Sequence, residues 1–352
     1  MKIYFETYGC AANKADEAVM RTLLKGHVFV DSSDDADLVI ILSCGVKGST
    51  EHRIMSRLWN LKGKKVLVGG CLTKIVKNLG KKFPAFSLIG PDEVPDIAGI
   101  VSKIEAGEKI VELSSKKCSH VVADISDETQ AINISSGCLG KCSYCATKLA
   151  RGNLHSYTIE EIVASVKKAV ANGAKKILIT AQDTGCYGLD IGTNLAELLK
   201  EILKIDGDYK IRVGMMNPFH AAKIADELIG IYKNPHILKF IHIPVQAGNN
   251  KVLKTMRRNY TVKQFESLVK KLRKGIPNLS VATDIICGFP GETDKQFDDT
   301  VKLVKRLKPE VMNLSRFHLR PGTEAQKMKQ VPASVIMKRS KMLFEIYGKL
   351  KS

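Results

Sequence analysis

Residues 131–145 read Ala-Ile-Asn-Ile-Ser-Ser-Gly-Cys-Leu-Gly-Lys-Cys-Ser-Tyr-Cys, a β-like run followed by three closely spaced cysteines. Ala131–Ser135 predicts a strand, and the Gly-containing loop after it carries Cys138, Cys142 and Cys145. A short loop with this spacing can place three sulfur atoms around one face of a metal cluster. Structural zinc and electron-transfer clusters normally take four protein ligands. Three cysteines therefore leave one metal position open to a cofactor or substrate.

The residues alone leave two other interpretations of this loop open, and neither involves a metal position without a protein ligand. His155 or Cys118 could supply a fourth ligand to a zinc site, or the cysteines could simply be buried.

A second trio of cysteines, Cys10, Cys44 and Cys71, is spread over the first part of the chain. Each follows one of three predicted strands, which are Lys2–Tyr8, Asp37–Leu42 and Lys65–Val68. Helix-length segments, Asn13–Lys25 and Thr50–Leu61, separate these strands, so we expect a parallel open α/β sheet. The carboxyl ends of parallel strands share one edge, where the three cysteines can meet. Independent core positions are the alternative.

The chain is expected to form two domains. Residues 1–102 form the open-sheet domain, 103–127 a mixed-charge linker with an edge strand at His120–Ala123, and 128–352 a second α/β domain. The second domain holds six β-like runs: Ala131–Ser135, Lys176–Ala181, Lys210–Met215, Lys239–Pro244, Ser280–Cys287 and Val311–His318. Amphipathic segments such as Ile159–Asn172 and Gln296–Leu307 lie between them. Six such units predict a partial (β/α)6 barrel of the TIM type rather than the closed eight-unit barrel.

Composition narrows the class of protein. The 352 residues carry a formal net charge of +19 with 44% hydrophobic residues, so a folded chain with an anionic partner is expected, nucleic acid first. No apolar run is long enough to span a bilayer, and Met1–Asn13 does not resemble a secretory signal. Nine cysteines in such a chain favour metal binding or reactive thiols over disulfides. We expect a cytoplasmic protein that does not bind membranes.

Further motifs accompany the two trios. They are Tyr8-Gly9-Cys10 with Asn13, Val46-Lys47-Gly48-Ser49-Thr50-Glu51, Gly70-Cys71-Leu72, Ala150-Arg151-Gly152, His242-Ile-Pro-Val-Gln-Ala-Gly248, Asp284-Ile-Ile-Cys-Gly-Phe-Pro-Gly-Glu-Thr293 and Arg320-Pro-Gly-Thr323. Over nearly the whole chain this combination resembles the radical S-adenosylmethionine methylthiotransferases. The segments 142–152 and 181–184 are most similar to the archaeal and eukaryotic branch, which acts on N6-threonylcarbamoyladenosine in tRNA.

The resemblance implies two 4Fe–4S clusters and S-adenosylmethionine as cofactors. One cluster would bind Cys138, Cys142 and Cys145 and generate a 5′-deoxyadenosyl radical from S-adenosylmethionine. The other would bind Cys10, Cys44 and Cys71 and supply methylated sulfur. The product is a methylthio group at C2 of the modified adenosine at position 37 of tRNA. No catalytic side chain is assigned.

The same resemblance suggests contacts to S-adenosylmethionine. Tyr144 fills the family's aromatic position before the last cysteine, while Gln182 and Asp183 end the second barrel strand. Gln246 could serve the ribose, and the segment from Ile286 to Gly288 could border the adenine. Each could equally be an ordinary residue at the rim of a barrel.

The implied partners are tRNA, a reductant protein and a sulfur source, with the chain expected to be monomeric. Residues 251–274 carry nine Lys or Arg and one acidic residue, consistent with binding to phosphates. Two features depart from the family: Leu42-Ser43-Cys44 replaces the usual Asn-Thr-Cys, and the usual C-terminal TRAM domain is absent from these 352 residues. A methylthiotransferase for another target, such as a ribosomal-protein residue, and a non-catalytic cluster- or zinc-dependent RNA-binding protein remain alternatives.

Cys118, Cys186 and Cys287 stay outside both trios. Cys287 is expected in the core, Cys118 has no partner pattern, and Cys186 is interpreted as structural although it lies at a strand end near the site.

Overall fold

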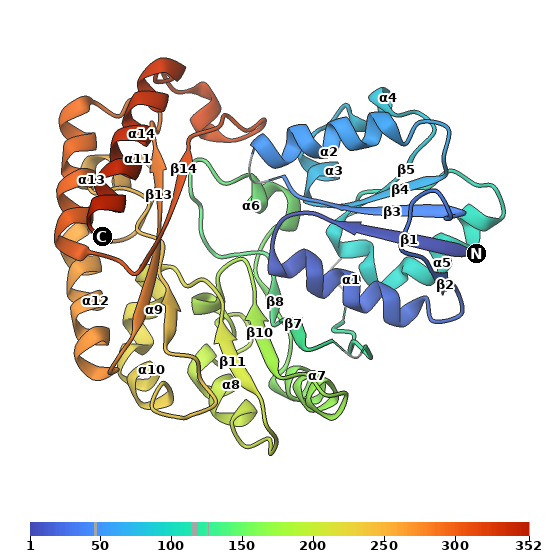
Figure 1. The fold of residues 1–352 in the computed structure, drawn as a ribbon, viewed down its shortest axis with the longest axis horizontal. Coiled ribbons are helices and arrows are strands. Elements are labelled where there is room, and N and C mark those ends of the chain that lie inside the picture. Colours follow the sequence, from blue (N-terminus) through green and yellow to red (C-terminus); the bar gives the residue numbers. More distant parts are fainter. Residues whose placement is uncertain (46–47, 115–118, 126, 352) are drawn as a thin grey trace.

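The computed structural model describes residues 1–45, 48–114, 119–125 and 127–351. Figure 1 shows two α/β units side by side, with the N-terminus and the C-terminus on opposite sides of the molecule. The expected fold class is therefore confirmed: an open parallel sheet followed by a partial barrel.

The first unit is a six-stranded parallel sheet. Its strands, in spatial order, are β2 (Val28–Phe29), β1 (Lys2–Thr7), β3 (Leu38–Ser43), β4 (Val66–Gly70), β5 (Ser87–Ile89) and β6 (Val111–Glu112). Every residue of β3 is buried, which is typical of a central parallel strand covered on both faces. The three strands predicted from sequence are confirmed to within a few residues.

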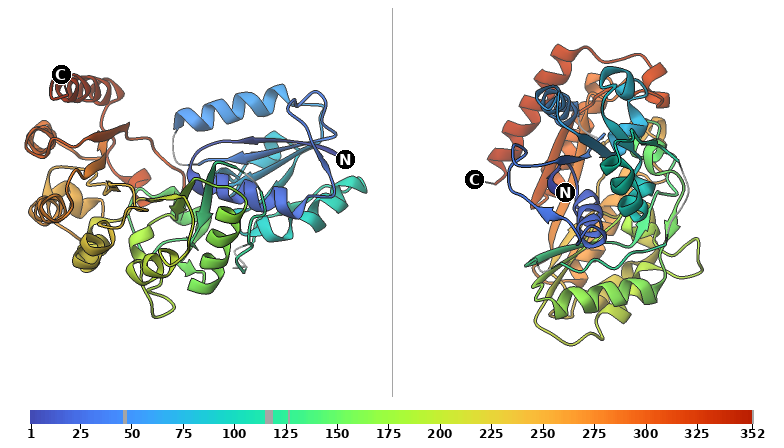
Figure 2. Two further views of the ribbon diagram at one scale, coloured as in Figure 1. Left: turned by 60° about the horizontal axis from the view of Figure 1, so that its bottom comes forward. Right: turned by 90° about the vertical axis from the view of Figure 1, so that its right-hand side faces the viewer.

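Helices cover both faces of this sheet. They are α1 (Ala11–Leu23), α2 (Gly48–Asn60), α3 (Cys71–Ile75), α4 (Leu79–Lys82), the 3-10 helix η1 (Pro91–Asp96) and α5 (Ile97–Glu105). One core joins α1 and α5 to alternate residues of β3, such as Ile40, and a second core joins α2 to the other residues, such as Ile41. Figure 2 shows α1 and α2 on opposite faces of the sheet.

Residues 103–127 are not simply a linker, which corrects the sequence-based expectation. Helix α5 continues to Glu105, and β6 pairs with β5 as an edge strand of the first sheet. His120–Ala123 forms no strand. Instead, His120 packs on Tyr157 with ring centroids 4.6 Å apart. A strand of two residues is too short to produce a recognisable alternation in the sequence.

The second unit contains all six predicted barrel strands. They are β7 (Thr129–Asn133), β10 (Lys176–Thr180), β11 (Lys210–Val213), β12 (Phe240–His242), β13 (Ser280–Cys287) and β14 (Val311–Arg316). They form two parallel three-stranded sheets, β7–β10–β11 and β12–β13–β14. A bridge between Ile211 and Ile237 and a hydrogen bond from Met216 N to the carbonyl of His242 join the two sheets.

The remaining elements surround this barrel. They are the hairpin strands β8 (Ser135–Ser136) and β9 (His155–Ser156), the α-helices α6 (Ala146–Arg151), α7 (Ile159–Ala171), α8 (Leu195–Ile202), α9 (Pro218–Ala221), α10 (Ala225–Ile231), α11 (Asn250–Thr255), α12 (Val262–Gly275), α13 (Asp294–Leu307) and α14 (Ala333–Lys349), and the 3-10 helices η2 (Thr184–Cys186), η3 (Ala222–Ile224) and η4 (Glu324–Lys327). Helices α7, α12 and α13 each begin with a capping box, which fixes where they start.

The first unit packs against both edges of the partial barrel. Helix α1 lies against β7, and Glu51 of α2 pairs with Arg320, which follows β14. None of the described helices is long and apolar enough to cross a bilayer.

Candidate functional site

The loop with Cys138, Cys142 and Cys145 runs from β8 to the first turn of α6, where Cys145 is the N-cap residue. A Cβ atom on Gly140 would lie 3.3 Å from the Cys138 sulfur and 3.8 Å from the Cys142 sulfur. The Gly140 N–H donates to Cys138 Sγ at 3.2 Å. The loop backbone therefore packs closely against two of the sulfur atoms.

The thiols of this loop influence one another. Burial raises the pKa of Cys145, and the charges of Cys142 and Cys138 raise it further. Hydrogen bonding from Cys186 lowers the pKa of Cys138 to about 7, although burial opposes this shift. The three thiols of the loop are therefore close enough for their charges to interact, as the cysteine spacing predicts.

Cys186 lies beside this loop. One ligand atom each from Cys138, Asp183 and Cys186 lies within 4.8 Å of the other two. The Cys186 side chain is fully buried and its thiol donates to the carbonyl of Asp183 at 3.2 Å. The interpretation of Cys186 as structural misses this contact with Cys138. The only signal in the sequence is its place directly after the second barrel strand.

Arg258 is a second residue that the sequence does not single out. Its Nη1 donates to Cys142 Sγ at 3.3 Å, while its Nε donates to the hydroxyl of Tyr260 at 2.9 Å. Tyr260 in turn donates to the carbonyl of Val245 at 2.9 Å, which anchors the pair after β12. A positive charge is thereby fixed against one cysteine sulfur.

The trio of Cys10, Cys44 and Cys71 gathers at the carboxyl edge of the first sheet. Cys10 follows β1, Cys44 follows β3 and Cys71 begins α3 after β4, and these three strands are neighbours. Burial raises the pKa of Cys71, and the charges of Cys10 and Cys44 add to that rise. The three cysteines are therefore close enough to interact, as the topology argument predicts.

Local structure around this trio is tightly packed. Gly9 has a φ of +104°, and a Cβ there would lie 2.8 Å from the Cys44 sulfur. The Asn13 side chain donates to the carbonyls of Tyr8 (2.7 Å) and Ser43 (3.1 Å), which ties together the turns that precede Cys10 and Cys44. Ser43, at the position where the family usually has Thr, donates to the carbonyl of Gly69 at 2.6 Å.

Helix α6 lies between the two trios. Cys145 begins this helix, while Cys71 and Ile75 of α3 form an apolar cluster with Ala146 and Ala150 on its side. One set of cysteines therefore lies at the start of α6, and the other contacts the side of the same helix.

Arg151 ends α6 and faces the trio of Cys10, Cys44 and Cys71. Its guanidinium donates to Asp16 of α1 at 2.6 Å, and it lowers the pKa of the Cys71 thiol. An arginine beside cysteines partly offsets the cost of gathering thiolates.

The residues expected near S-adenosylmethionine are only partly brought together. Tyr144 lies on the cysteine loop and packs edge-on against Phe289, at 6.1 Å between ring centroids. Gln182 accepts a 2.6 Å hydrogen bond from the N–H of Gly137, directly before Cys138. Asp183 is buried, and its carboxylate accepts from the N–H groups of Gly185 and Asn217 and pairs with His220. These three residues adjoin the cysteine loop.

The later residues of that group lie on the other half-barrel. Gln246 has a φ of +72° and bridges to β13, where its carbonyl accepts from the N–H of Ile286. Gly288 has a φ of +78°, and a Cβ there would lie 2.4 Å from Ile336 of α14. Gly288 therefore packs closely against α14, while the adjacent Phe289 contacts Tyr144 of the cysteine loop, and a cofactor contact by this segment stays a prediction.

A polar network links the last three barrel strands. Asp284 Oδ1 accepts from Asn313 at 2.8 Å and lies 2.7 Å from His242 Nε2. His242 and Asp284 belong to motifs quoted above, but nothing in their spacing predicts that they form a pair. All three side chains keep some exposure to solvent.

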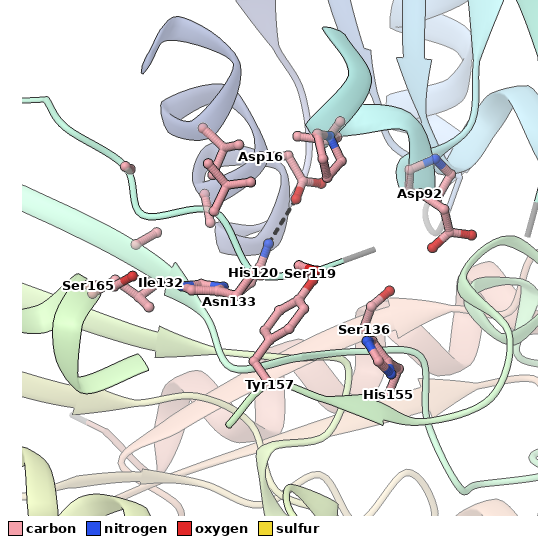
Figure 3. A pocket seen from close by; sticks show the side chains of 18 of the residues that line it. Asp16, Asp92, Ser119, His120, Ile132, Asn133, Ser136, His155, Tyr157 and Ser165 are labelled. Atoms are coloured by element: carbon pink, nitrogen blue, oxygen red, sulfur yellow. Dashed lines mark hydrogen bonds between the residues drawn. The ribbon is translucent and has the colours of Figure 1, made fainter. Parts of the chain in front are cut away.

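A small cavity of about 60 Å³ lies at the seam between the two units. Figure 3 shows Asp16 from α1 and Asn133 from β7 joined by a hydrogen bond, with His155 and Tyr157 nearby. The cysteines of the two trios are not among its described lining residues. The cavity thus belongs to the seam rather than to either cysteine site.

The donor chemistry of both trios fits iron–sulfur clusters. Each trio offers three thiols, glycine backbone packed against sulfur, and one arginine: Arg258 for the loop of Cys138 and Arg151 for the trio of Cys71. Thiolate ligands with nearby hydrogen-bond donors are typical of such clusters. Cys118 lies outside the described residues, and Cys287 is buried in the barrel core, as expected.

Comparisons with known proteins agree with this arrangement. The Radical SAM superfamily matches residues 132–304, and the uncharacterized protein family UPF0004 matches residues 2–89. A radical S-adenosylmethionine methyltransferase, TsrM from Kitasatospora setae, has a similar fold with a TM-score of 0.66, at 15% identity over 92% of this chain and 74% of that one. The barrel and its cysteine loop therefore define a radical S-adenosylmethionine enzyme.

Curated relatives narrow the class. The chain is 44% identical to a probable threonylcarbamoyladenosine tRNA methylthiotransferase of Pyrococcus horikoshii, over 98% of this chain and 84% of the relative. It is 36% identical to the human threonylcarbamoyladenosine tRNA methylthiotransferase, over 98% of this chain and 62% of the relative. This chain belongs to the family of threonylcarbamoyladenosine tRNA methylthiotransferases.

Proposed function

We propose that this chain adds a methylthio group to C2 of N6-threonylcarbamoyladenosine at position 37 of tRNA. The observation that carries the proposal is the placement of two cysteine trios, one from each unit, next to the same helix: Cys145 caps α6, and Cys71 contacts its side. Sulfur insertion into a C–H bond needs a radical source and a sulfur source close together, and this arrangement supports both. The names of the relatives identify the substrate class.

Cys138, Cys142 and Cys145 would hold one 4Fe–4S cluster, and Cys10, Cys44 and Cys71 the other. When bound, the first cluster would supply the electron for reductive cleavage of S-adenosylmethionine, with methionine as the leaving group, and the second would supply the sulfur. The protein's own part is to position these groups and exclude water. Because Asp183 and Gln182 adjoin the cysteine loop, they are better placed than Gly288 to orient S-adenosylmethionine.

The substrate would be approached through charge. Residues 251–274 form α11, α12 and the turn between them, and the five basic residues on α12, which are Lys263, Lys270, Lys271, Arg273 and Lys274, favour an anionic polymer. A sulfur source and a reductant protein complete the reaction. We place the reaction in the cytoplasm, with a monomeric chain as the working unit.

The test is mass spectrometry of nucleosides from tRNA that carries threonylcarbamoyladenosine. The tRNA is incubated without oxygen with reconstituted protein, S-adenosylmethionine, a reductant and sulfide. A methylthio derivative of that nucleoside is the expected product. The variant Cys145→Ala is the matched control and should form neither this product nor 5′-deoxyadenosine. Formation of 5′-deoxyadenosine by the unmodified protein without any methylthio nucleoside would contradict the substrate and favour another target, such as a ribosomal protein.

A further inference from the structure

A basic groove of about 860 Å³ borders the outer side of the cysteine loop. We define it by Leu139 and Lys141 of the loop, Lys254 of α11, and Arg257, Arg258 and Tyr260 before α12. None of its described lining residues is acidic. Its position beside the loop that carries Cys138 and Cys142 raises the question of what it binds.

The charge of the basic groove is available to a partner. Lys141 and Lys254 are exposed and form no ion pair with a described residue. Arg257 is half-exposed and pairs with Glu324 at 2.8 Å, so its charge is partly offset. Leu139 adds an exposed apolar side chain, 44% accessible, at the edge. A small apolar contact within a basic rim suits a weak, transient encounter with an acidic protein surface.

One side chain separates the basic groove from the cysteine site. Arg258 lines the groove, and its Nη1 reaches Cys142 Sγ at 3.3 Å. Tyr260 holds the Arg258 guanidinium in place from the same wall. A partner seated here would be separated from that sulfur by a single hydrogen-bonded side chain, and electron transfer weakens steeply with distance.

We propose that the basic groove is the docking site of the reductant, a small acidic protein with a one-electron flavin or iron–sulfur centre. This inference rests on the proposed function, since only a cluster on the cysteine loop gives the electron a destination. The partner's reduced centre loses one electron and is oxidised. The cluster that Cys138, Cys142 and Cys145 would hold gains this electron and is reduced, and no bond is made or broken.

The competing occupant is RNA, which is also anionic. A strand of RNA would need phosphate contacts, which the same lysines could supply. The contact between Arg258 and Cys142 favours the reductant, because it gives an electron a path through one hydrogen-bonded side chain, whereas phosphate contacts need no connection to a cysteine sulfur. The variant Lys254→Glu distinguishes the two occupants: it should slow cluster reduction if the groove binds the reductant, and it should weaken tRNA binding if the groove binds RNA.

The experiment uses the reconstituted protein and a small acidic flavodoxin in its hydroquinone form as the probe. Stopped-flow absorbance measures the rate of cluster reduction in Lys254→Glu, Lys254→Arg and the control Lys200→Glu, an exposed lysine on α8. We expect the rate to fall at least fivefold in Lys254→Glu and to stay near the original in the other two. Carbodiimide cross-linking should join Lys254 or Lys141 to carboxylates of the flavodoxin. Iron content and reduction by dithionite verify that the cluster is intact.

Equal rates in all proteins, with no cross-link to the basic groove, would overturn the docking site. Loss of tRNA affinity in Lys254→Glu with an unchanged rate of reduction would assign the groove to RNA and overturn it as well. Failure of the proposed function would give a different result. The flavodoxin would still reduce the cluster at a rate that depends on Lys254, but no methylthio nucleoside would form.

Discussion

Arg151 Nη2 lies 2.6 Å from Asp16 Oδ2, and both side chains are almost completely buried between the two units. Asp16 also accepts from Asn133 of β7 at 2.8 Å, so one carboxylate joins α1, α6 and the barrel. Burial alone raises the pKa of Asp16, and the Arg151 charge opposes this rise. The seam between the two units therefore depends on a charge pair that has little access to water.

Replacing Arg151 with Leu should lower the free energy of unfolding by about 3–5 kcal/mol, because it leaves the Asp16 carboxylate buried without its cation. Thermal or denaturant unfolding measures the loss. The exposed pair of Lys204 and Glu201 gives the matched control, and Lys204→Ala should cost less than about 1 kcal/mol. Adding Asp16→Asn to Arg151→Leu should recover part of the stability. Equal effects of Arg151→Leu and Lys204→Ala would contradict this assignment.

Changing Cys10, Cys44 and Cys71 together to Ala should lower the iron content from about eight to about four per chain. Cleavage of S-adenosylmethionine should persist, since the other trio is intact, while methylthio product disappears. Cys287→Ala, at a buried cysteine of the barrel core, is the control and should keep the full iron content. If the triple variant no longer forms 5′-deoxyadenosine, the two trios do not divide the work as proposed.

Replacing Cys186 with Ala should shift the reduction potential of the cluster near Cys138. The Cys186 thiol lies within 4.8 Å of the Cys138 sulfur, and a polar S–H group there favours the more negative, reduced cluster, so its loss should lower the potential by at most on the order of 40 mV, the equivalent of one hydrogen bond. A redox titration followed by electron paramagnetic resonance measures this change. In Cys186→Ser a hydroxyl group replaces the thiol, so the reduction potential should stay closer to that of the original protein. A potential unchanged in both variants would show that the contact with Cys138 has no influence.

Burial lowers the pKa of His120 to about 4, so this side chain remains neutral in the folded protein at pH values where the unfolded chain gains a proton. Between about pH 6.5 and 4 the unfolded state binds more protons, and the free energy of unfolding should therefore fall as the pH drops. The contribution is at most about 3 kcal/mol. His120→Gln should flatten this part of the pH profile. His52→Gln, at an exposed position of α2, should leave it unchanged.

Binding of tRNA should weaken as salt rises, with a linear dependence of log affinity on log salt concentration. The net charge of +19 and the basic residues of α12 are the physical reason. Fluorescence anisotropy with labelled tRNA at several salt concentrations measures the slope. Affinity independent of salt would exclude phosphate contacts as the main source of binding.

The sequence alone was enough to predict the long strands and to predict that each group of three cysteines lies together. Long apolar strands and helical periodicity are local signals, and parallel topology then places Cys10, Cys44 and Cys71 at one edge. The sequence did not predict β2, β5 and β6, because these strands of two or three residues carry no periodicity, whereas the equally short β12 lies within the longer β-like run Lys239–Pro244. It also missed the contact of Arg258 with Cys142, which joins residues far apart in the chain through side-chain packing alone.

Helix α6 is a short, rigid connection between the two cysteine sites. Its six residues rise about 9 Å, and Cys145 at its start and Arg151 at its end belong to different cysteine sites. Cys145 directly precedes α6, and Ala146 and Ala150 on its side contact Cys71, so a rigid helix rather than a loop connects the two cysteine sites. A residue inserted into α6 would therefore rotate and shift one cysteine site relative to the other.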